Sequence, residues 1–196
     1  MPSPEKFKKT LLENQVDRAI IDEVFQGYEK IVDKSPKKNK ASFFHQAIDV
    51  LEKVLAPEQV KEIVEGNACC KSGVRERNSK KFARINDGLG IMERLQKINK
   101  APYLNMGHAE IDDKGDLIVY GVSYMYEGKY ECGCPTISRT KRDYPISKGY
   151  CFCCGGHFKY HYEIMLCVKL NMKEVISSPL DSSGESPCVF RFEICN

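Results

Sequence analysis

Cysteine and histidine residues crowd into one short stretch of this 196-residue chain. Half of its ten cysteines and half of its four histidines fall between positions 132 and 161. Thiolate and imidazole groups bind zinc and other transition metals more tightly than most side chains do. The stretch therefore predicts a metal site, whose candidate ligands are Cys132, Cys134, Cys151, Cys153, Cys154, His157 and His161.

The spacing of the cysteines indicates how a metal could be held. Cys151 and Cys154 have the Cys-x-x-Cys spacing that lets two sulfurs chelate one ion. Cys132 and Cys134 would point the same way if they lay on a strand, because side chains alternate there. The candidates outnumber the ligands of one tetrahedral ion, so an iron–sulfur cluster is the alternative to zinc. We expect zinc first.

The same residues could instead provide a reactive thiol. A cysteine in the first turn of a helix lies near bare backbone N–H groups, which lower its pKa. Cys153 or Cys154 would then be the nucleophile of a hydrolase, with His157 as its base. A bound metal that activates water is a second route to hydrolysis. Cys151 and Cys154 could also form a redox pair, although no βαβ pattern precedes them, and buried core thiols are the remaining interpretation.

Other cysteines lie outside this stretch. Cys69 and Cys70 follow a predicted helix and join the site only if the fold brings them to it. Cys167 falls off the core face of its predicted helix and Cys195 is the penultimate residue, so we assign neither a role.

Charge and hydropathy argue against nucleic-acid binding and membrane association. The net charge of +3 is weaker than the basic excess of most nucleic-acid-binding proteins, so nucleic acid is not an expected partner. The basic run 71–84 is flanked by acidic residues and predicts a solvated helix face. No apolar run is long enough for a signal peptide or a membrane span. These features predict a cytoplasmic protein with no membrane partner and with reduced cysteines.

The first hundred residues predict a helical region. Apolar residues recur at every third or fourth position, as on one face of a helix, until a turn at Pro36 interrupts them. Pro57 fits the first turn of a later helix. The predicted helices cover residues 4–31, a segment capped by Ser42, and residues 58–65, 75–85 and 88–98.

Residues 101–196 predict a sheet with one long helix. A turn cluster at 112–116 separates two runs rich in Tyr, Val and Ile, which indicates a β-hairpin. On the predicted helix, Cys154, His157 and His161 share one face. The whole chain is then one compact α+β unit: residues 1–100 form a helical region, and an antiparallel sheet with a long helix packed on it follows. The expected elements are strands at 103–111, 117–126, 130–138, 173–177 and 188–194 and a helix at 155–170.

A family resemblance covers about a quarter of the chain, near its C-terminus. It rests on a Cys-rich helix start, a Ser-Pro turn and a last strand that opens with Cys-x-Phe: Gly149-Tyr-Cys151-Phe-Cys153-Cys154-Gly-Gly-His157, Ser177-Ser178-Pro179-Leu180 with Gly184, and Pro187-Cys188-Val-Phe190-Arg-Phe192. This pattern resembles the vinyl-reductase-type small-molecule-binding domains and the family of aminothiazoline carboxylate hydrolase-like proteins.

The resemblance implies a helix pair over an antiparallel sheet. It also implies a ligand pocket lined by the cysteines and the last strand, in which Cys188 joins Cys151, Cys153 or Cys154. It does not explain the helical first hundred residues, and it carries neither an activity nor a ligand to this chain.

The leading hypothesis is therefore a cytoplasmic protein that binds a small-molecule ligand or a metal in a Cys/His pocket and could act as a sensor. Cys188, Cys69 and Cys70 are outer candidates for that pocket. The alternative is a thiol- or metal-dependent hydrolase of a small substrate that contains sulfur or nitrogen. A third hypothesis is a protein-interaction module, in which the helical half supplies the surface. A homodimer is compatible with all three.

Overall fold

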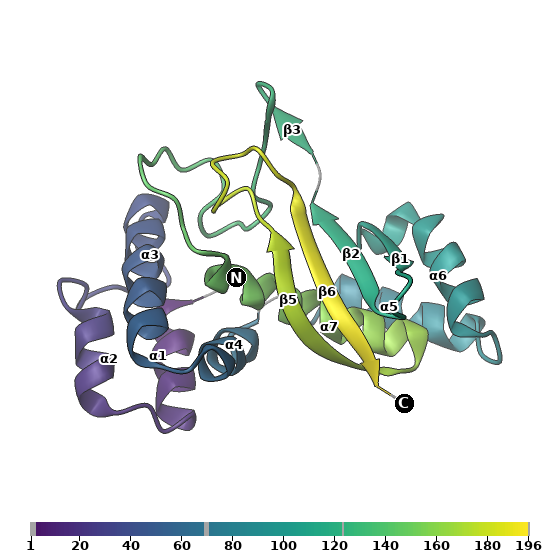
Figure 1. Cartoon of the computed structure of the whole chain (residues 1–196), viewed down its shortest axis with the longest axis horizontal. Helices are drawn as coiled ribbons and strands as arrows, with labels where there is room; N and C mark the ends of the chain where they lie inside the picture. The colour runs from purple at the N-terminus through teal and green to yellow at the C-terminus, as the bar shows by residue number, and fades with distance from the viewer. Residues whose placement is uncertain (1–2, 69–70, 123, 196) are drawn as a thin grey trace.

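The computed structural model describes residues 3–68, 71–122 and 124–195 and has the predicted α+β fold (Figure 1). Helix α7 (Phe152–Leu166) packs along one face of the main sheet. The sheet is antiparallel, with strands in the order β1 (His108–Ile111), β2 (Leu117–Val122), β6 (Cys188–Cys195) and β5 (Lys169–Ser177).

The first helices form a bundle at one end of the molecule (Figure 1). Its core is aromatic: the Phe44 ring centroid lies 5.6 Å from that of Phe7 and 4.9 Å from that of Phe43. Phe44 also lies 5.3 Å from Tyr150, in the 3-10 helix η2 (Lys148–Cys151) that leads into α7. The bundle therefore packs directly against the cysteine-rich segment. Its helices are α1 (Pro4–Glu13), α2 (Arg18–Phe25), α3 (Lys37–Val54) and α4 (Pro57–Gly66).

Two predictions about this bundle are wrong. The expected helix over 4–31 is broken, because Gln15 has a left-handed φ of 54° and Asp17 begins a new helix by accepting a hydrogen bond from the Ala19 N–H at 2.7 Å. Ser42 does not cap α3, which starts earlier, directly after Pro36. The Ser42 hydroxyl instead lies 2.5 Å from the hydroxyl of Tyr28.

The later helices follow the predictions closely. Helix α4 begins at Pro57, as expected. Helices α5 (Val74–Ile85) and α6 (Ile91–Asn99) occupy the two segments predicted after it. Among the described residues, no helix is long and apolar enough to cross a membrane.

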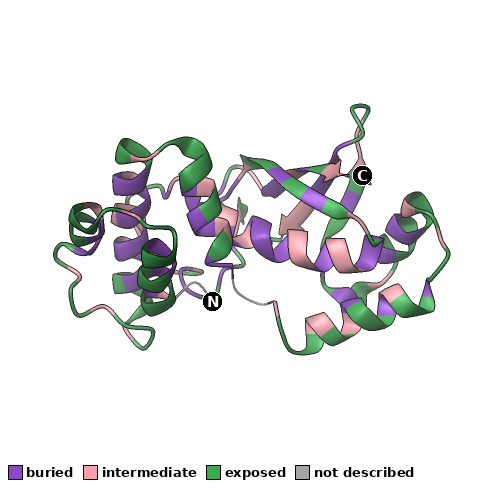
Figure 2. Ribbon diagram, turned by 90° about the horizontal axis from the view of Figure 1, so that it is seen from below, coloured by how far each residue is buried: buried purple, intermediate pink, exposed green. Residues whose placement is uncertain are grey.

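Helix α7 lies at the centre of the molecule, between the sheet and the helices of the first half (Figure 2). Lys159 of α7 forms an ion pair with Glu65 of α4 at 2.7 Å. Arg94 of α6 donates a hydrogen bond to the carbonyl of Met165, in the last turn of α7, at 3.0 Å. These contacts hold α7 in place from the side opposite the sheet.

The predicted β-hairpin of the second half is confirmed. Strands β1 and β2 pair in an antiparallel register, and the turn between them is closed by the Asp112 carboxylate. This carboxylate accepts hydrogen bonds from the backbone N–H groups of Lys114 and Asp116, both at 2.9 Å. Asp112 stabilises its own turn through these hydrogen bonds, and this local effect is why the turn cluster predicted the hairpin correctly.

The last strand also has the predicted alternation. Phe190 and Phe192 are fully buried, whereas Arg191 points outward and pairs with Glu174 at 3.3 Å. The helix predicted at 155–170 begins and ends too late: α7 starts at Phe152, and Cys167 adopts a left-handed φ of 57° that ends it. Strand β5 therefore begins four residues earlier than position 173.

The strand predicted at 130–138 is wrong. Strands β3 (Met125–Tyr126) and β4 (Lys129–Tyr130) form a two-stranded hairpin, and the chain then leaves the strand conformation. Cys132 and Cys134 lie in this loop, which turns where the carbonyl of Cys134 accepts a hydrogen bond from the Ser138 N–H at 2.7 Å. Pro135 has no N–H for a ladder, which disfavours a continued strand.

Candidate functional site

Five cysteines from distant parts of the sequence line one cavity of about 690 Å³. Two come from the loop after β4, one from η2, one from the first turn of α7 and one from the start of β6. We call this cavity, together with its apolar wall of Val122, Phe158 and Phe190, the cysteine pocket. Its cysteines are Cys132, Cys134, Cys151, Cys154 and Cys188.

Hydrogen bonds to hydroxyl groups fix two of these thiols. The sulfur of Cys134 lies 3.2 Å from the hydroxyl of Tyr150, and the sulfur of Cys151 lies 3.1 Å from the hydroxyl of Ser178. The sulfur of Cys132 accepts a hydrogen bond from the Cys134 N–H at 3.4 Å. The sulfurs of Cys132, Cys134 and Cys151 thus each have a hydrogen-bond partner within the protein.

Burial favours the neutral form of four of the thiols in the pocket. It raises the pKa of Cys151 to about 12 and raises those of Cys132, Cys154 and Cys188 as well, and the nearby thiols add to the effect because a second thiolate would repel the first. Cys154 is half-buried because it faces the cavity. The protein atoms around its thiol still exclude enough water to raise its pKa. Its pKa therefore moves in the opposite direction from that expected for a cysteine in the first turn of a helix.

Polar side chains also line the pocket. Arg75, the second residue of α5, donates a hydrogen bond from Nη1 to Nε2 of His157 at 3.0 Å. A guanidinium group has no acceptor, so Nε2 of His157 must accept and the proton of the neutral ring lies on Nδ1. Ser72 and Asn105 also line the pocket.

Two of the seven candidate residues lie elsewhere. The thiol of Cys153 lies 3.7 Å from the carbonyl of Asn67, at the end of α4, and Nδ1 of His161 lies 3.0 Å from the hydroxyl of Ser79 in α5. Neither side chain lines the cysteine pocket. The predicted common face of Cys154, His157 and His161 therefore divides, because α5 covers His161 while His157 reaches the edge of the cavity.

The metal prediction remains a prediction. Within 3–68, 71–122 and 124–195, no three side chains of His, Cys, Asp or Glu are arranged to hold a metal ion. Cys69 and Cys70, the proposed outer members, lie outside the described residues. Cys188, which the resemblance placed with Cys151, Cys153 or Cys154, lies with Cys151 and Cys154 in the pocket.

Sequence reasoning missed three residues of the site: Arg75, Tyr150 and Ser178. The run 71–84 was predicted to be a solvated face, and Arg77 is exposed, but Arg75 is half-buried at the pocket. A signal was present, because Arg75, Ser79 and Phe82 recur at helical spacing and mark the inner face of α5.

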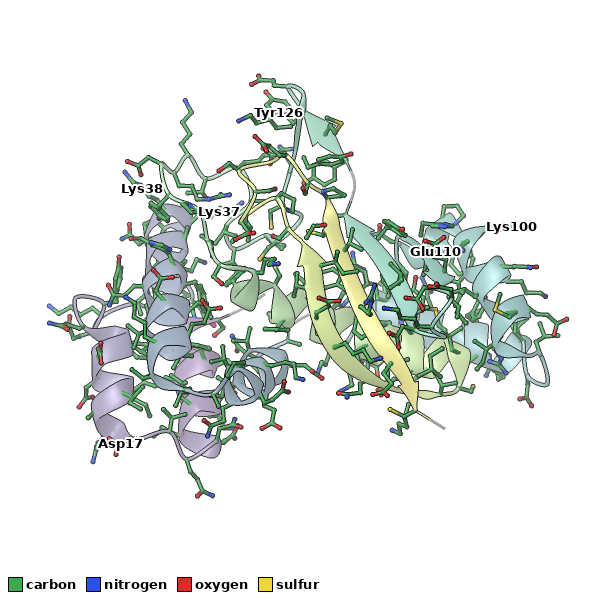
Figure 3. The ribbon with its side chains drawn as sticks, in the orientation of Figure 1. Asp17, Lys37, Lys38, Lys100, Glu110 and Tyr126 are labelled. Carbon is green, nitrogen blue, oxygen red and sulfur yellow. The ribbon has the colours of Figure 1, made fainter. Side chains whose placement is uncertain are left out.

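A second cavity of about 780 Å³ is lined in part by the β3–β4 hairpin, whose Tyr126 is labelled in Figure 3. Its wall contains charges of both signs and shares Cys132 with the cysteine pocket. The charged residues are Glu127, Lys129, Glu131, Arg139, Lys141, Arg142 and Asp143.

Comparison with known proteins adds no family to this geometry. No family model matches the chain, no curated protein matches it, and no solved structure matches it. The function must therefore be argued from the residues of the cysteine pocket itself.

Proposed function

We propose that this protein binds a small organic molecule in the cysteine pocket. The observation that carries the proposal is the cavity of about 690 Å³ lined by five cysteines from separate segments. Ligand pockets commonly enclose about 300–1,000 Å³, far more than a single metal ion occupies. Few core cavities of this size are left unfilled, because interiors are packed as densely as organic crystals.

The walls of the pocket suit a ligand with an apolar or polarisable body. Neutral thiols behave as small, polarisable apolar groups, and the rings of Phe158 and Phe190 extend this surface. The ring centroids of these two residues lie 5.3 Å apart.

A bound ligand would contact a loop, a helix start and a strand at the same time. Binding to the folded state alone would stabilise that state by mass action, which is the basis for a sensor role.

Zinc is the second candidate ligand, and the gathering of five thiols favours it. Zinc would replace the thiol protons, so binding would release protons and overcome the raised pKa values. Four of the five thiols of Cys132, Cys134, Cys151, Cys154 and Cys188 would be its donors, and the side chains would have to turn toward a common centre. An iron–sulfur cluster would use the same thiols and would add visible absorption, which zinc does not.

A hydrolase is the competing hypothesis, with Cys154 as nucleophile and His157 as base. The raised pKa of Cys154 opposes it, since the thiolate is the nucleophile. Alkylation with iodoacetamide separates the two: a hydrolase predicts one cysteine that reacts fast below neutral pH. The binding hypothesis predicts that Cys154 and Cys188 react more slowly than the exposed Cys167.

The proposal is tested with the neutral fluorophore N-phenyl-1-naphthylamine. We expect saturable binding to the wild type and its loss in Cys154→Phe, which fills the pocket. The matched control is Cys167→Phe, the same substitution at an exposed position outside the pocket. Val122→Phe blocks the apolar wall in case Cys154→Phe does not fold. Binding that survives both blocking variants, or that is absent from the wild type, contradicts the proposal.

Native mass spectrometry of protein isolated without oxygen separates the two ligand classes. A bound organic mass supports the small molecule. The mass of one zinc ion less the displaced protons, confirmed by elemental analysis and lost on chelation, supports zinc instead.

A further inference from the structure

The cysteine pocket has an unbalanced charge. Among the described residues that line it, Arg75 alone carries a permanent charge, and none is Asp, Glu or Lys. The neighbouring cavity under the hairpin differs, because its basic and acidic side chains can offset one another.

No acidic side chain of the described residues pairs with Arg75. Within that part of the chain, no carboxylate oxygen lies within 4.0 Å of its guanidinium nitrogens, and its Nη1 donates a hydrogen bond to the ring of His157. Arg191, which is also half-buried, pairs with Asp112 and Glu174. A half-buried cation that lacks a counter-charge is costly, and a ligand can provide that charge.

The contact with His157 orients the guanidinium group. It uses one N–H of Nη1, and the group has five N–H donors in a rigid planar fork. The donors that remain can bind two oxygen atoms of one anion side by side. Ser72 and Asn105 also line the pocket and offer further polar contacts.

We propose that the ligand of the cysteine pocket carries an anionic oxygen group that binds Arg75, with its apolar body against the thiols and Phe158. This inference rests on the proposed function, since it assigns the chemistry of a ligand for the same cavity. Carboxylate, sulfonate and phosphate groups share the chemistry that a guanidinium recognises.

A pair of probes that differ by one charge tests the inference. 1-Anilinonaphthalene-8-sulfonate is N-phenyl-1-naphthylamine with an added sulfonate group. We expect the anionic probe to bind the wild type more tightly than the neutral one. Arg75→Gln should lower the affinity for the anionic probe on the order of tenfold, because a charge-assisted hydrogen bond is lost. The affinity for the neutral probe should stay unchanged.

Arg77→Gln is the matched control, because it removes the same charge from an exposed position two residues away on α5. It should change neither affinity. Arg75→Lys keeps the charge but not the planar fork, so we expect an intermediate affinity for the anionic probe. Equal loss in the two glutamine variants, or no preference for the anionic probe in the wild type, overturns the inference. If the neutral probe does not bind at all, the proposed function itself fails.

Competition identifies the kind of anion. Benzoate, benzenesulfonate and phenyl phosphate are titrated against the bound anionic probe, with benzyl alcohol as the neutral control. Displacement by one or more of the anions, dependent on Arg75, supports the inference and ranks the three groups. Equal displacement by benzyl alcohol contradicts it.

Discussion

The two sides of helix α7 carry the same residue types in different surroundings. Cys154 and His157 line the cysteine pocket, whereas Cys153 is packed against the end of α4 and His161 against the middle of α5. His161 is fully buried, and Cys153 is 1% exposed. Residue type and spacing therefore do not distinguish a pocket residue from a core residue. Which of the two a residue becomes depends on the element that packs against its side of α7.

The packed side of α7 is filled closely. A Cβ atom at Gly156 would lie 2.8 Å from the carbonyl oxygen of Glu65 and 2.9 Å from Cβ of Ala68. The absence of a side chain at this position allows α4 and α7 to approach. On the other side, the cavity leaves space beside Cys154. The two sides should therefore respond differently to the same kind of substitution.

The largest expected difference is between the two histidines. His161→Ala should lower the free energy of unfolding by about 3 kcal/mol, because it leaves a cavity in a filled region and removes a partner of Ser79. His157→Ala should cost only about 1 kcal/mol, because it enlarges a space that already exists. Urea denaturation of both variants measures the difference, and equal losses would show that the two sides are packed alike.

A smaller difference is expected between two adjacent glycines. Gly156→Val should destabilise the protein by about 2 kcal/mol, because the backbone of α4 cannot move aside. At Gly155, an added Cβ meets the flexible end of Met172, so Gly155→Val should cost less. Thermal unfolding of the pair provides the measurement. A greater loss at Gly155 would contradict the assignment of the tight contact to the α4 side.

The smallest expected effect concerns pH. The pKa of Cys151 is raised from 9.0 to about 12, so the folded protein keeps this proton where the unfolded chain loses it. Its contribution to stability is complete well below pH 9 and falls as the pH rises toward 12, by at most about 1.4 kcal/mol per pH unit. Cys151→Ser, which keeps a hydroxyl near Ser178, should therefore flatten the loss of stability in alkaline solution.

Urea denaturation under reducing conditions between about pH 8 and pH 10 tests this, since thiols ionise in that range. Cys167→Ser is the control, because Cys167 is exposed. If both variants follow the wild-type slope, Cys151 does not retain its proton in the folded state.

Local patterns made much of the fold predictable. The Asp112 turn and the alternation through Phe190 and Phe192 are determined by neighbours in the sequence, so both were found. The helix break at Gln15 was missed, because its left-handed backbone leaves the apolar rhythm on both sides intact. The end of α7 was placed four residues too late for a similar reason, the left-handed backbone of Cys167.

The site was harder to predict, because it depends on contacts between distant segments. The cluster of cysteines was visible in the sequence, but the division between Cys153 and Cys154 depends on where α4 ends. Arg75 looked like one more basic residue of a solvated helix. Its role at the pocket becomes visible only in the fold, where α5 lies beside α7 and the guanidinium group of Arg75 contacts His157.

The central position of β6 has a consequence for slow motions. This strand carries Cys188 and Phe190 at the pocket and pairs with β2 on one side and β5 on the other. Amide protons held between two neighbouring strands exchange with solvent mainly through global opening. The loop with Cys132 and Cys134 has no such ladder, so one wall of the pocket should exchange slowly and the other quickly. Ligand binding in the pocket would then change the amide exchange rates of the loop.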